Sequence, residues 1–383
     1  MDHHAAPLKL CYVGPADSVT TRRWAGWFAA RGHAVTIVTV EPSAEPLSAG
    51  MGQIDLRSAC KPRKLGRLVS ASRLGPTLRR LAPDLVHVHY AKGLAWGLLA
   101  ASSRPLVVTP WGSDVLEEQG AFREGYSKHL TAAVLNRAAL VTVHSAYMEA
   151  HVRPLLKPSV PVARIGWGVD LRRFRLGLDV SALRTRWNIA DHRQVVFSPR
   201  LARPFYRLDA IIRAFPVVHR RCPNALLVLS EQAADEAYVA GLKDLVSQLG
   251  LHEHVRFVGA IPYHEMPYWL NLADVSVMMP ESDGMPNSLW EAMACGAVPV
   301  LRGLPQYREV IRHEENGLFA DDGPEALGQA IAALLEDRAQ RARMAHRNQE
   351  LARERADQDR EMSRMEAWYR TLAGSAERSA ATG

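Results

Sequence analysis

Two carboxylates flank a turn from loop to helix in the second half of the chain. Asp283 and Glu291 are separated by seven residues, and a glycine and a proline soon after Asp283 keep that stretch from forming helix. The unpaired N–H groups and partial positive charge of a helix N-terminus bind phosphate, and carboxylates accept paired hydrogen bonds from neighbouring hydroxyls of a ribose or a hexose. The pattern therefore predicts a nucleotide-sugar site. The alternative is an ordinary loop whose acids cap the helix and face solvent.

The helix that follows this loop has recognisable start and stop signals. Asn287 and Ser288 are both favourable N-cap residues, so the helix is expected to begin near them. Gly296 is a typical residue at a helix C-terminus. Glu291 then lies in the first or second turn, and Asp283 lies before the helix. The two acids are expected to reach the same pocket from opposite sides.

Strand-like and helix-like segments alternate along the chain. The first series of apolar, strand-like runs covers residues 8–14, 34–40, 85–90, 106–109 and 140–144, and a Pro/Gly-rich break follows at 157–170. A second series covers residues 195–198, 226–230, 255–259, 275–279, 298–301 and 317–320. Such alternation predicts α/β structure, with parallel sheets covered by helices on both faces.

Two domains are expected, because single hydrophobic cores seldom grow past about 250–300 residues and this chain has 383. We predict two Rossmann-like, doubly wound domains that face each other across a cleft, where open α/β sheets bind ligands. The first domain is expected at residues 1–170, joined by a C-terminal helix at 360–375, and the second, nucleotide-sugar-binding domain at 171–359. No Gly-x-Gly-x-x-Gly follows any predicted strand, which argues against a nicotinamide-dependent enzyme.

Composition limits the class of protein. Lys and Arg outnumber Asp and Glu by 47 to 40, a net charge of +7 that favours anionic partners such as nucleotides, although an arginine-rich genome would give the same balance. The four cysteines are scattered, so neither a disulfide framework nor a zinc site is expected. The N-terminal residues lack the apolar core of a signal peptide, and no run approaches the roughly 20 apolar residues that span a bilayer. We predict a cytoplasmic protein, or one bound peripherally at the inner face of the membrane.

One segment could make such a peripheral contact. Lys61–Leu81 is basic with interleaved leucines, a composition that favours docking on anionic lipid. The alternative is a solvated amphipathic helix over the first sheet, interrupted at Gly75 and Pro76. No basic–aromatic module of the nucleic-acid-binding kind is present in the sequence, so nucleic acid is not an expected partner.

The loop-to-helix segment resembles the Glu-x7-Glu signature of retaining glycosyltransferases of the GT-B fold, most of all glycosyltransferase family four. Asp283 stands at the first acidic position and Glu291 at the second. The resemblance extends from about residue 8 to about residue 370. Its other matching stretches are Pro83–His89, Thr109–Asp114, Gly168–Phe174, Ser198–Leu201 and Asn316–Phe319.

The resemblance implies roles for the residues of the donor site. In the family, the second acid binds the ribose of the nucleotide and the first contacts hydroxyls of the transferred sugar, which implies Glu291 for the ribose and Asp283 for the hexose. The first glutamate of the signature is an aspartate here, and this shortening can alter which sugar is accepted. Backbone amides between the acids meet the phosphate and the sugar. The remaining donor-binding residues are Gly14, after the first strand, and Gly284, Met285, Pro286, Asn287 and Ser288 of the loop.

The family also places two cations on the diphosphate, an arginine after the first strand of the second domain and a lysine. Arg200 matches the arginine, whereas Tyr206 and Arg207 lie near the lysine position. We predict that Arg207 replaces the lysine, with Arg203 in reserve, because a guanidinium can bind phosphate in a bidentate manner. The alternative makes Arg203 and Arg207 ordinary surface residues at a helix start.

On the acceptor side, many relatives have a histidine after the fifth strand, where this chain has Trp111. Asp114 is expected either to bind hydroxyls of the acceptor or sugar, or to cap the next helix. His87 and His89 alternate on one strand and should share a face, with His89 nearer the cleft and His87 packed or hydrogen-bonded. The sequence offers no third ligand beside them, so no metal site is predicted.

Together these features predict a retaining transferase that moves a hexose from a nucleoside diphosphate sugar, with UDP or GDP as the nucleotide, to a hydroxyl acceptor. The departing diphosphate can accept the acceptor's proton, so no cofactor is required, and Asp283, Arg200 and Arg207 are the predicted catalytic residues. The acceptor is expected to be a sugar, a lipid-linked compound or a small molecule, in the synthesis of cell-envelope polysaccharide, glycolipid or natural-product glycosides. Two alternatives remain: a nucleotide-sugar epimerase or hydrolase of GT-B fold, and a non-catalytic nucleotide- or carbohydrate-binding protein.

Overall fold

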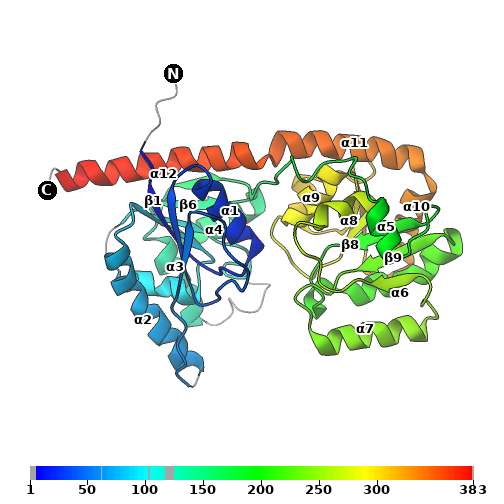
Figure 1. Ribbon diagram of the computed structural model, residues 1–383, viewed down its shortest axis with the longest axis horizontal. Coiled ribbons are helices and arrows are strands. Elements are labelled where there is room, and N and C mark those ends of the chain that lie inside the picture. The colour runs from blue at the N-terminus through cyan, green and yellow to red at the C-terminus, as the bar shows by residue number, and fades with distance from the viewer. Residues whose placement is uncertain (1–5, 62, 102–103, 117–124, 382–383) are drawn as a thin grey trace. The chain divides into compact units, whose positions relative to one another are not determined.

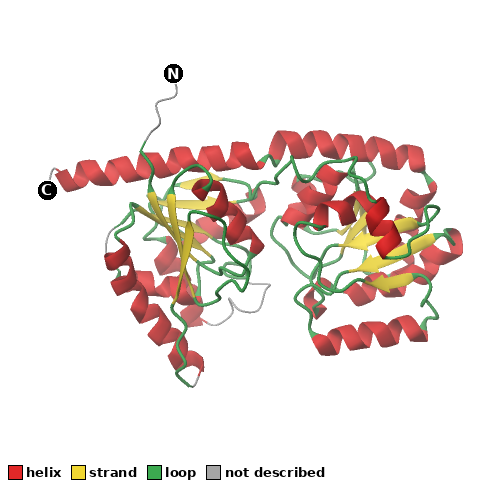
Figure 2. Cartoon of the chain, in the orientation of Figure 1, coloured by secondary structure: helices red, strands yellow, loops and turns green. Residues whose placement is uncertain are grey.

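The computed structural model describes residues 6–61, 63–101, 104–116 and 125–381. Within these ranges the chain forms two compact units. The first comprises the residues up to Trp167 and those from Asp359 onward, and the second is Gly168–Gln358. Each unit contains a parallel sheet with helices on both of its faces (Figure 1, Figure 2). The predicted fold class, α/β with two doubly wound parallel sheets, is confirmed.

The sheet of the first unit is seven-stranded in the described residues, with the order β3-β2-β1-β4-β5-β6-β7. Its strands are β1 (Lys9–Val13), β2 (Ala34–Thr39), β3 (Met51–Asp55), β4 (Leu85–His89), β5 (Leu106–Thr109), β6 (Leu140–Val143) and β7 (Val162–Arg164). The helices are α1 (Val19–Ala29), α2 (Arg63–Leu81), the 3₁₀ segments η1 (Gly93–Ala100) and η3 (Arg153–Leu155), α3 (Gly125–Leu135), α4 (Ala146–Val152) and α12 (Gln358–Ala381).

Successive side chains of β1 point to opposite faces of the sheet, and both faces are buried. Leu10 and Tyr12 point into one hydrophobic cluster, which they share with residues of α1 and α12. Cys11 and Val13 point into the other, which includes residues of α2, η1, α3 and α4. Strands buried in this way read as continuous apolar runs, which is why most of them could be recognised in the sequence.

The second unit repeats this plan with a six-stranded sheet of order β10-β9-β8-β11-β12-β13. Its strands are β8 (Gln194–Ser198), β9 (Ala225–Leu229), β10 (Val255–Phe257), β11 (Val275–Met278), β12 (Val298–Arg302) and β13 (Leu318–Ala320). The helices are α5 (Ser181–Arg186), α6 (Leu208–Arg221), α7 (Glu236–Gln248), α8 (Met266–Leu272), α9 (Asn287–Cys295), α10 (Pro324–Glu336) and α11 (Arg338–Arg355), with 3₁₀ segments η4 (Pro204–Tyr206) and η5 (Pro305–Glu309). Helices α6, α7 and α10 contribute to one core cluster, and α5, α8 and α9 to the other.

Each sheet has one point where the strand order reverses. In the first unit the chain winds outward from β1 to β2 and β3, and then returns to place β4 on the other side of β1. In the second unit β8 is followed outward by β9 and β10, and β11 returns to its other side. Loops that leave two adjacent strands in opposite directions open a crevice at the carboxyl ends, where α/β sheets bind ligands. The pairs β1–β4 and β8–β11 therefore define where a site is expected.

Three details differ from the sequence predictions. Strands β3 and β7 were not expected, because Met51–Asp55 is largely polar or Gly-containing and Val162–Arg164 lies within the Pro/Gly-rich break. The interruption expected at Gly75 and Pro76 is wrong, since α2 runs through both residues. The buried side chains of Leu74 and Leu78 hold the helix against the core on either side of the proline.

The start and stop of α9 follow from local chemistry. Gly296 takes a left-handed conformation with φ of 90°, which glycine adopts without steric cost, so the predicted stop is confirmed. The start differs by one position. Pro286 is the N-cap, Asn287 is the first helical residue and Ser288 lies inside the first turn. Proline suits this position because it has no N–H group to satisfy.

Candidate functional site

The β8–β11 crevice of the second unit collects the residues of the predicted donor site. Arg200 lies two residues beyond the end of β8, and the loop from Glu281 to Pro286 connects β11 to α9. The two segments are held together by the backbone N–H of Glu281, which donates to the carbonyl of Phe205 at 3.0 Å. The fold thus brings together an arginine and an acidic loop that are about 80 residues apart in the sequence.

Arg200 and Asp283 form an ion pair at this carboxyl edge of the sheet. Nη2 of Arg200 lies 2.8 Å from Oδ2 of Asp283, and Nη1 donates to Oγ of Ser288 at 3.0 Å. Both side chains are largely buried, with 9% and 15% of their surface exposed. The ring of Tyr206 packs against the guanidinium, with Cζ 4.5 Å from the ring centroid. Tyr206, near the position expected for lysine, therefore contributes a cation–π contact in place of a second charge.

Burial and charge oppose each other in this pair. Burial works against the charge on Arg200, but the attraction of Asp283 outweighs it, so the pKa of Arg200 stays above its ordinary value. Burial raises the pKa of Asp283 above its ordinary value, while Arg200, the Tyr307 hydroxyl and the Gly284 N–H each act to lower it. The ion pair is therefore shielded from solvent. Loss of any one of these hydrogen bonds is expected to change the pKa of Asp283.

Two residues that the sequence did not reveal hold Asp283 in place. The hydroxyl of the fully buried Tyr307 donates to Oδ2 of Asp283 at 2.8 Å, and Nε2 of Gln306 donates to its backbone carbonyl at 2.6 Å. The N–H of Gly284 donates to Oδ1 at 2.9 Å. Both new residues belong to η5, which follows β12, so no local pattern near residue 283 could indicate them.

Glu291 has its own tyrosine partner. It lies on α9, is buried, and accepts a hydrogen bond from the hydroxyl of Tyr263 at 2.7 Å. Tyr263 comes from the loop between β10 and α8. Burial, followed by the charge of Glu291, raises the pKa of Cys295 one turn further along α9. The two acids of the signature are thus each held by a tyrosine from a different part of the second unit.

The loop residues between the acids are only in part available to a ligand. The Gly284 N–H is used by Asp283, Met285 is buried in the core, and Pro286 has no N–H. The N–H groups of Asn287 and Ser288 lie in the first turn of α9, where a helix supplies no acceptor. Oδ1 of Asn287 is buried without a hydrogen-bond partner among the described residues. The amides open to a phosphate are therefore those at the start of α9, and an amide role for Pro286 is wrong.

The structure places the two predicted lysine substitutes outside the Arg200–Asp283 pair. Arg207 is the N-cap of α6, has a left-handed backbone with φ of 52°, and its Nη1 lies 2.5 Å from Oδ2 of Asp322. Arg302, the last residue of β12, approaches the same oxygen at 3.0 Å and also donates to the carbonyl of Pro280 at 3.2 Å. Arg203 is exposed, and its Nε donates to a backbone carbonyl. Sequence reasoning missed Arg302. The sequence feature that could have indicated it is an arginine at the end of an apolar strand.

In the first unit, Gly14 and His89 meet at the β1–β4 crevice. A Cβ atom at Gly14 would lie 2.6 Å from the carbonyl oxygen of His89, so close packing accounts for this glycine. His87 and His89 share a face, as expected, with ring centroids 4.7 Å apart. His87 is hydrogen-bonded through its ring nitrogens to the hydroxyls of Tyr369 and Thr109. His89 is fully buried, and burial lowers its pKa to about 3, so its ring is neutral at physiological pH.

Asp114 pins two loops of the first unit together. Its buried carboxylate accepts hydrogen bonds from the N–H groups of Ala91 at 2.7 Å and of Trp111 and Gly112 at 2.9 Å each. These contacts join the loop after β4 to the loop after β5. All three donors are backbone N–H groups, so the carboxylate organises the loop that carries Trp111 and ties it to the loop after β4.

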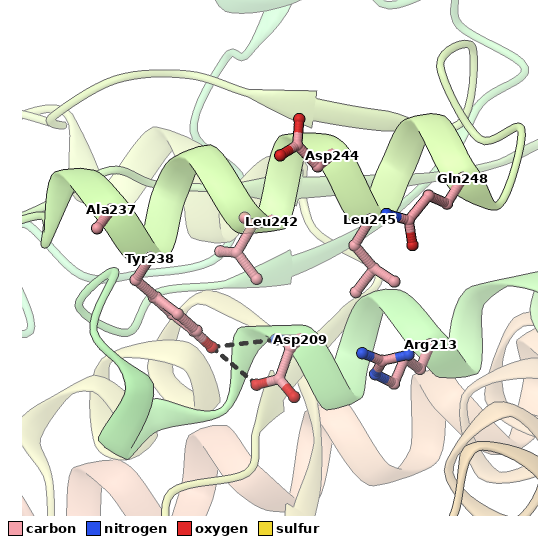
Figure 3. A pocket seen from close by; sticks show the side chains of 9 residues that line it. Asp209, Arg213, Ala237, Tyr238, Leu242, Asp244, Leu245 and Gln248 are labelled. Atoms are coloured by element: carbon pink, nitrogen blue, oxygen red, sulfur yellow. Dashed lines mark hydrogen bonds between the residues drawn. The ribbon is translucent and has the colours of Figure 1, made fainter.

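One open pocket of about 460 Å³ lies between α6 and α7 of the second unit (Figure 3). The Tyr238 hydroxyl closes one end by hydrogen bonding to Asp209, at 2.8 Å to its carboxylate and 3.2 Å to its N–H. None of the predicted site residues lines this pocket. Among the described residues no group of three or more His, Cys, Asp or Glu side chains is arranged to hold a metal ion.

Comparison with known proteins connects this geometry to a family. Residues 179–351 match the family described as glycosyl transferases group 1, and residues 9–145 match the family described as glycosyl transferase 4-like. A GDP-mannose-dependent alpha-(1-6)-phosphatidylinositol monomannoside mannosyltransferase of Mycobacterium tuberculosis is 30% identical over 69% of this chain and 72% of its own length. The protein of the same name from Mycolicibacterium smegmatis is 28% identical over 82% and 76%.

Solved structures share the fold at low sequence identity. Sucrose-phosphate synthase from Thermosynechococcus elongatus is 19% identical, covers 96% of this chain and 100% of its own, and has a TM-score of 0.83. HepE from Anabaena, crystallised with UDP and glucose, is 18% identical over 98% and 100%, with a TM-score of 0.77. These likenesses support the same two-unit α/β architecture.

Proposed function

Because the chain belongs to the glycosyl transferases group 1 and is a GT-B glycosyltransferase, we propose that it transfers a hexose from UDP-hexose or GDP-hexose to a hydroxyl acceptor with retention of configuration. The observation that carries the proposal is the cluster at the β8–β11 crevice. There, Arg200 is paired with Asp283 ahead of α9, and Glu291 lies on α9 beyond its free N-terminal amides. This combination of groups suits a diphosphate flanked by two sets of sugar hydroxyls.

In this proposal each charged group takes one part of the donor. Arg200 and the first amides of α9 bind the diphosphate, Glu291 accepts hydrogen bonds from the ribose, and Asp283 accepts them from the hexose. The ion pair supports the assignment, because a diphosphate can share Arg200 and leave the Asp283 carboxylate oriented by Tyr307.

The reaction needs no protein nucleophile. The bond between the anomeric carbon and the diphosphate oxygen breaks, the acceptor oxygen bonds to the same carbon from the same face, and the acceptor proton passes to the departing diphosphate. The protein orients the two substrates and stabilises the negative charge that develops on the leaving group. Arg200 is the residue best placed for that charge, and the cluster is proposed to work without a metal ion.

The names of the relatives support a mannose or related hexose on a GDP carrier, and a sugar or glycolipid acceptor. UDP is kept as a second carrier because the HepE structure of the same fold was crystallised with UDP. We assign the protein to cell-envelope polysaccharide, glycolipid or natural-product glycoside synthesis on this basis. Relatives named as transferases support this reading, so neither an epimerase or hydrolase nor a non-catalytic binding protein is favoured.

Peripheral membrane contact through Lys61–Leu81 is part of the proposal. In the described part of this segment, α2 exposes Leu65 by 48% and Leu68 by 63%, and Arg67 is exposed between them. The segment contains seven basic residues and no acidic ones. Exposed leucines beside cations suit the inner, anionic face of a membrane. No helix in the described ranges combines the length and apolarity needed to cross a bilayer.

Vesicle sedimentation tests the membrane contact. Vesicles with anionic phosphatidylglycerol are expected to sediment the protein, and purely zwitterionic vesicles are not. The double variant Leu65→Ser, Leu68→Ser is expected to stay in the supernatant. Leu176→Ser is a matched control, because this leucine is also exposed but lies in the second unit. Equal sedimentation of the double variant and the control would remove α2 from the proposal.

The catalytic proposal is tested with a panel of nucleotides and sugars. Thermal shift with UDP, GDP, ADP and dTDP identifies the carrier, since a ligand present at about 100 times its Kd stabilises the protein by about 2.7 kcal/mol. Incubation with the matching labelled sugars and no acceptor should give slow hydrolysis. NMR of the released sugar at early times should show the anomeric configuration of the donor. Inverted product would refute retention, and no stabilisation by any nucleotide would refute the donor site.

A further inference from the structure

Four aromatic side chains gather at the carboxyl ends of neighbouring strands in the first unit. His89 ends β4, Trp111 follows β5, His144 follows β6 and Trp167 follows β7. The ring centroid of Trp167 lies 5.2 Å from that of His144, 5.8 Å from that of Trp111 and 6.1 Å from that of His89. We call these four residues the His–Trp cluster. It occupies the sheet edge where α/β folds bind ligands.

Four ring nitrogens of this cluster are buried without partners among the described residues. Nε2 of His89, Nε1 of Trp111 and both ring nitrogens of His144 have no hydrogen-bond partner among the described residues. The His89 side chain is completely buried. Buried polar atoms in proteins are nearly always paired with protein, water or ligand. Four unpaired nitrogens at one sheet edge therefore indicate that a polar molecule completes them.

His87 shows that this is not the general condition of histidines in the unit. It lies two residues before His89 on β4 and is equally buried. Both of its ring nitrogens are nevertheless hydrogen-bonded, to the hydroxyls of Tyr369 and Thr109. The same core thus pairs both nitrogens of His87, whereas His89, nearer the carboxyl edge, has Nδ1 paired with the Thr21 hydroxyl at 3.3 Å and Nε2 without a partner among the described residues.

The chemistry of the cluster selects the kind of ligand. Burial lowers the pKa of His89 and of His144 to about 3, so both rings are neutral, with one donor and one acceptor nitrogen each. Nδ1 of His89 already pairs with the Thr21 hydroxyl, which leaves its Nε2 and both nitrogens of His144 for a ligand. None of the four side chains carries a charge at neutral pH. Tryptophan faces pack well against apolar ring faces, and their N–H groups donate to oxygen. These properties suit hydroxyl groups on an uncharged ring better than a phosphate or a carboxylate.

We propose that the His–Trp cluster binds an uncharged, hydroxyl-rich ring of the acceptor, of the sugar or cyclitol class. The inference rests on the proposed transferase function and deepens it by naming the acceptor chemistry. His144 and Trp167, which the sequence did not single out, are specificity-determining residues in it, and Trp111 presents its indole N–H to a ring hydroxyl.

The test measures ring binding by the full-length protein saturated with the nucleoside diphosphate that stabilises it. The probes are methyl α-D-glucopyranoside, methyl α-D-mannopyranoside and myo-inositol, each compared with a phosphorylated counterpart of the same ring. Binding is followed by tryptophan fluorescence and by saturation-transfer NMR. The variant His144→Phe keeps the ring volume and removes both nitrogens. His219→Phe is the matched control, since His219 also has a buried, unpaired nitrogen but lies in the second unit.

At least one uncharged ring is expected to bind, more tightly than its phosphorylated counterpart. Its affinity is expected to fall at least about tenfold in His144→Phe and to stay unchanged in His219→Phe. Tighter binding of the phosphorylated form, or unchanged binding in His144→Phe, overturns the proposal. Failure of every ring while the nucleotide still binds also overturns it and leaves the donor site intact. Failure of nucleotide binding itself would instead overturn the proposed function.

Discussion

Removing the Tyr307 hydroxyl is the most direct test of how the acidic loop works. Tyr307→Phe deletes the 2.8 Å hydrogen bond to Oδ2 of Asp283 and leaves the aromatic ring in its buried position. A hydrogen bond to a charged group contributes about 1.5–3 kcal/mol, and about 1.4 kcal/mol corresponds to a tenfold change in rate. Asp283 keeps Arg200 and the Gly284 N–H, so the lower end of that range applies. We expect kcat to fall about tenfold, with little change in affinity for the nucleotide.

The pH profile of this variant separates an electrostatic role from a packing role. Tyr307 acts to lower the pKa of Asp283, which burial has already raised above its ordinary value. Without the hydroxyl, the pKa of Asp283 rises further. In the proposed function the ionised carboxylate of Asp283 is the active form. As the pH falls, the variant should therefore lose activity at a higher pH than the wild type does. A packing defect alone would lower kcat without shifting the pH at which activity is lost on the acid side of the profile (the acid limb).

Tyr263→Phe is the matched control, because it removes the 2.7 Å hydrogen bond to the other acid, Glu291. Here the nucleotide affinity, measured by calorimetry, is expected to weaken about tenfold, with kcat at saturating donor nearly unchanged. Tyr307→Phe should therefore lower mainly kcat, and Tyr263→Phe should weaken mainly nucleotide binding. If Tyr307→Phe weakens nucleotide binding and leaves both kcat and the acid limb unchanged, the assignment of Asp283 to the hexose is refuted.

Three further predictions follow from the second unit. Glu291→Ala is expected to weaken nucleoside diphosphate binding severely, and calorimetry that shows unchanged affinity would refute the ribose role. Arg207→Ala and Arg302→Ala are each expected to lower kcat on the order of 10²-fold, whereas Arg203→Ala should lose little; the reverse order in steady-state kinetics would make Arg203 the relevant cation. Gly296→Ala is expected to destabilise the fold by about 1–2 kcal/mol in urea unfolding, because an L-residue at φ of 90° is strained; an unchanged midpoint would contradict this.

Much of the fold could be predicted because its strands are buried on both faces. The run Val275–Met278 is buried throughout and is apolar except for Ser276, so it stands out in the sequence after Asp274. β3 could not be recognised, because it is an edge strand with Gly52 and Gln53 exposed to solvent. The break predicted at Pro76 failed for a related reason. Local propensity favoured it, but packing of the surrounding helix was stronger.

The candidate site was predictable only where its residues are close in sequence. Asp283 and Glu291 share one loop and helix, and their spacing alone suggested a pocket. Tyr263 and Tyr307 are far from them along the chain, and only the strand order of the sheet brings their hydroxyls to the two acids. Arg207 shows a further limit. Its left-handed backbone and its contact with Asp322 depend on the loop geometry between β8 and α6, which residue types do not specify.

Charge balance gives the reason why a second cation is expected to act on turnover. Arg200 is paired with Asp283, so together they contribute no net charge, and a bound diphosphate must share Arg200 with the carboxylate. Arg207 and Arg302 both contact the single carboxylate of Asp322, so this contact has one cation more than it has acids, and Arg302 also reaches the Pro280 carbonyl in the loop that follows β11. The diphosphate gains negative charge as the glycosidic bond breaks, so this excess stabilises the transition state more than the ground state. Loss of either arginine should consequently lower kcat more than it weakens binding of the donor. We therefore propose that a shared ion pair, rather than a single substituted residue, compensates for the missing lysine.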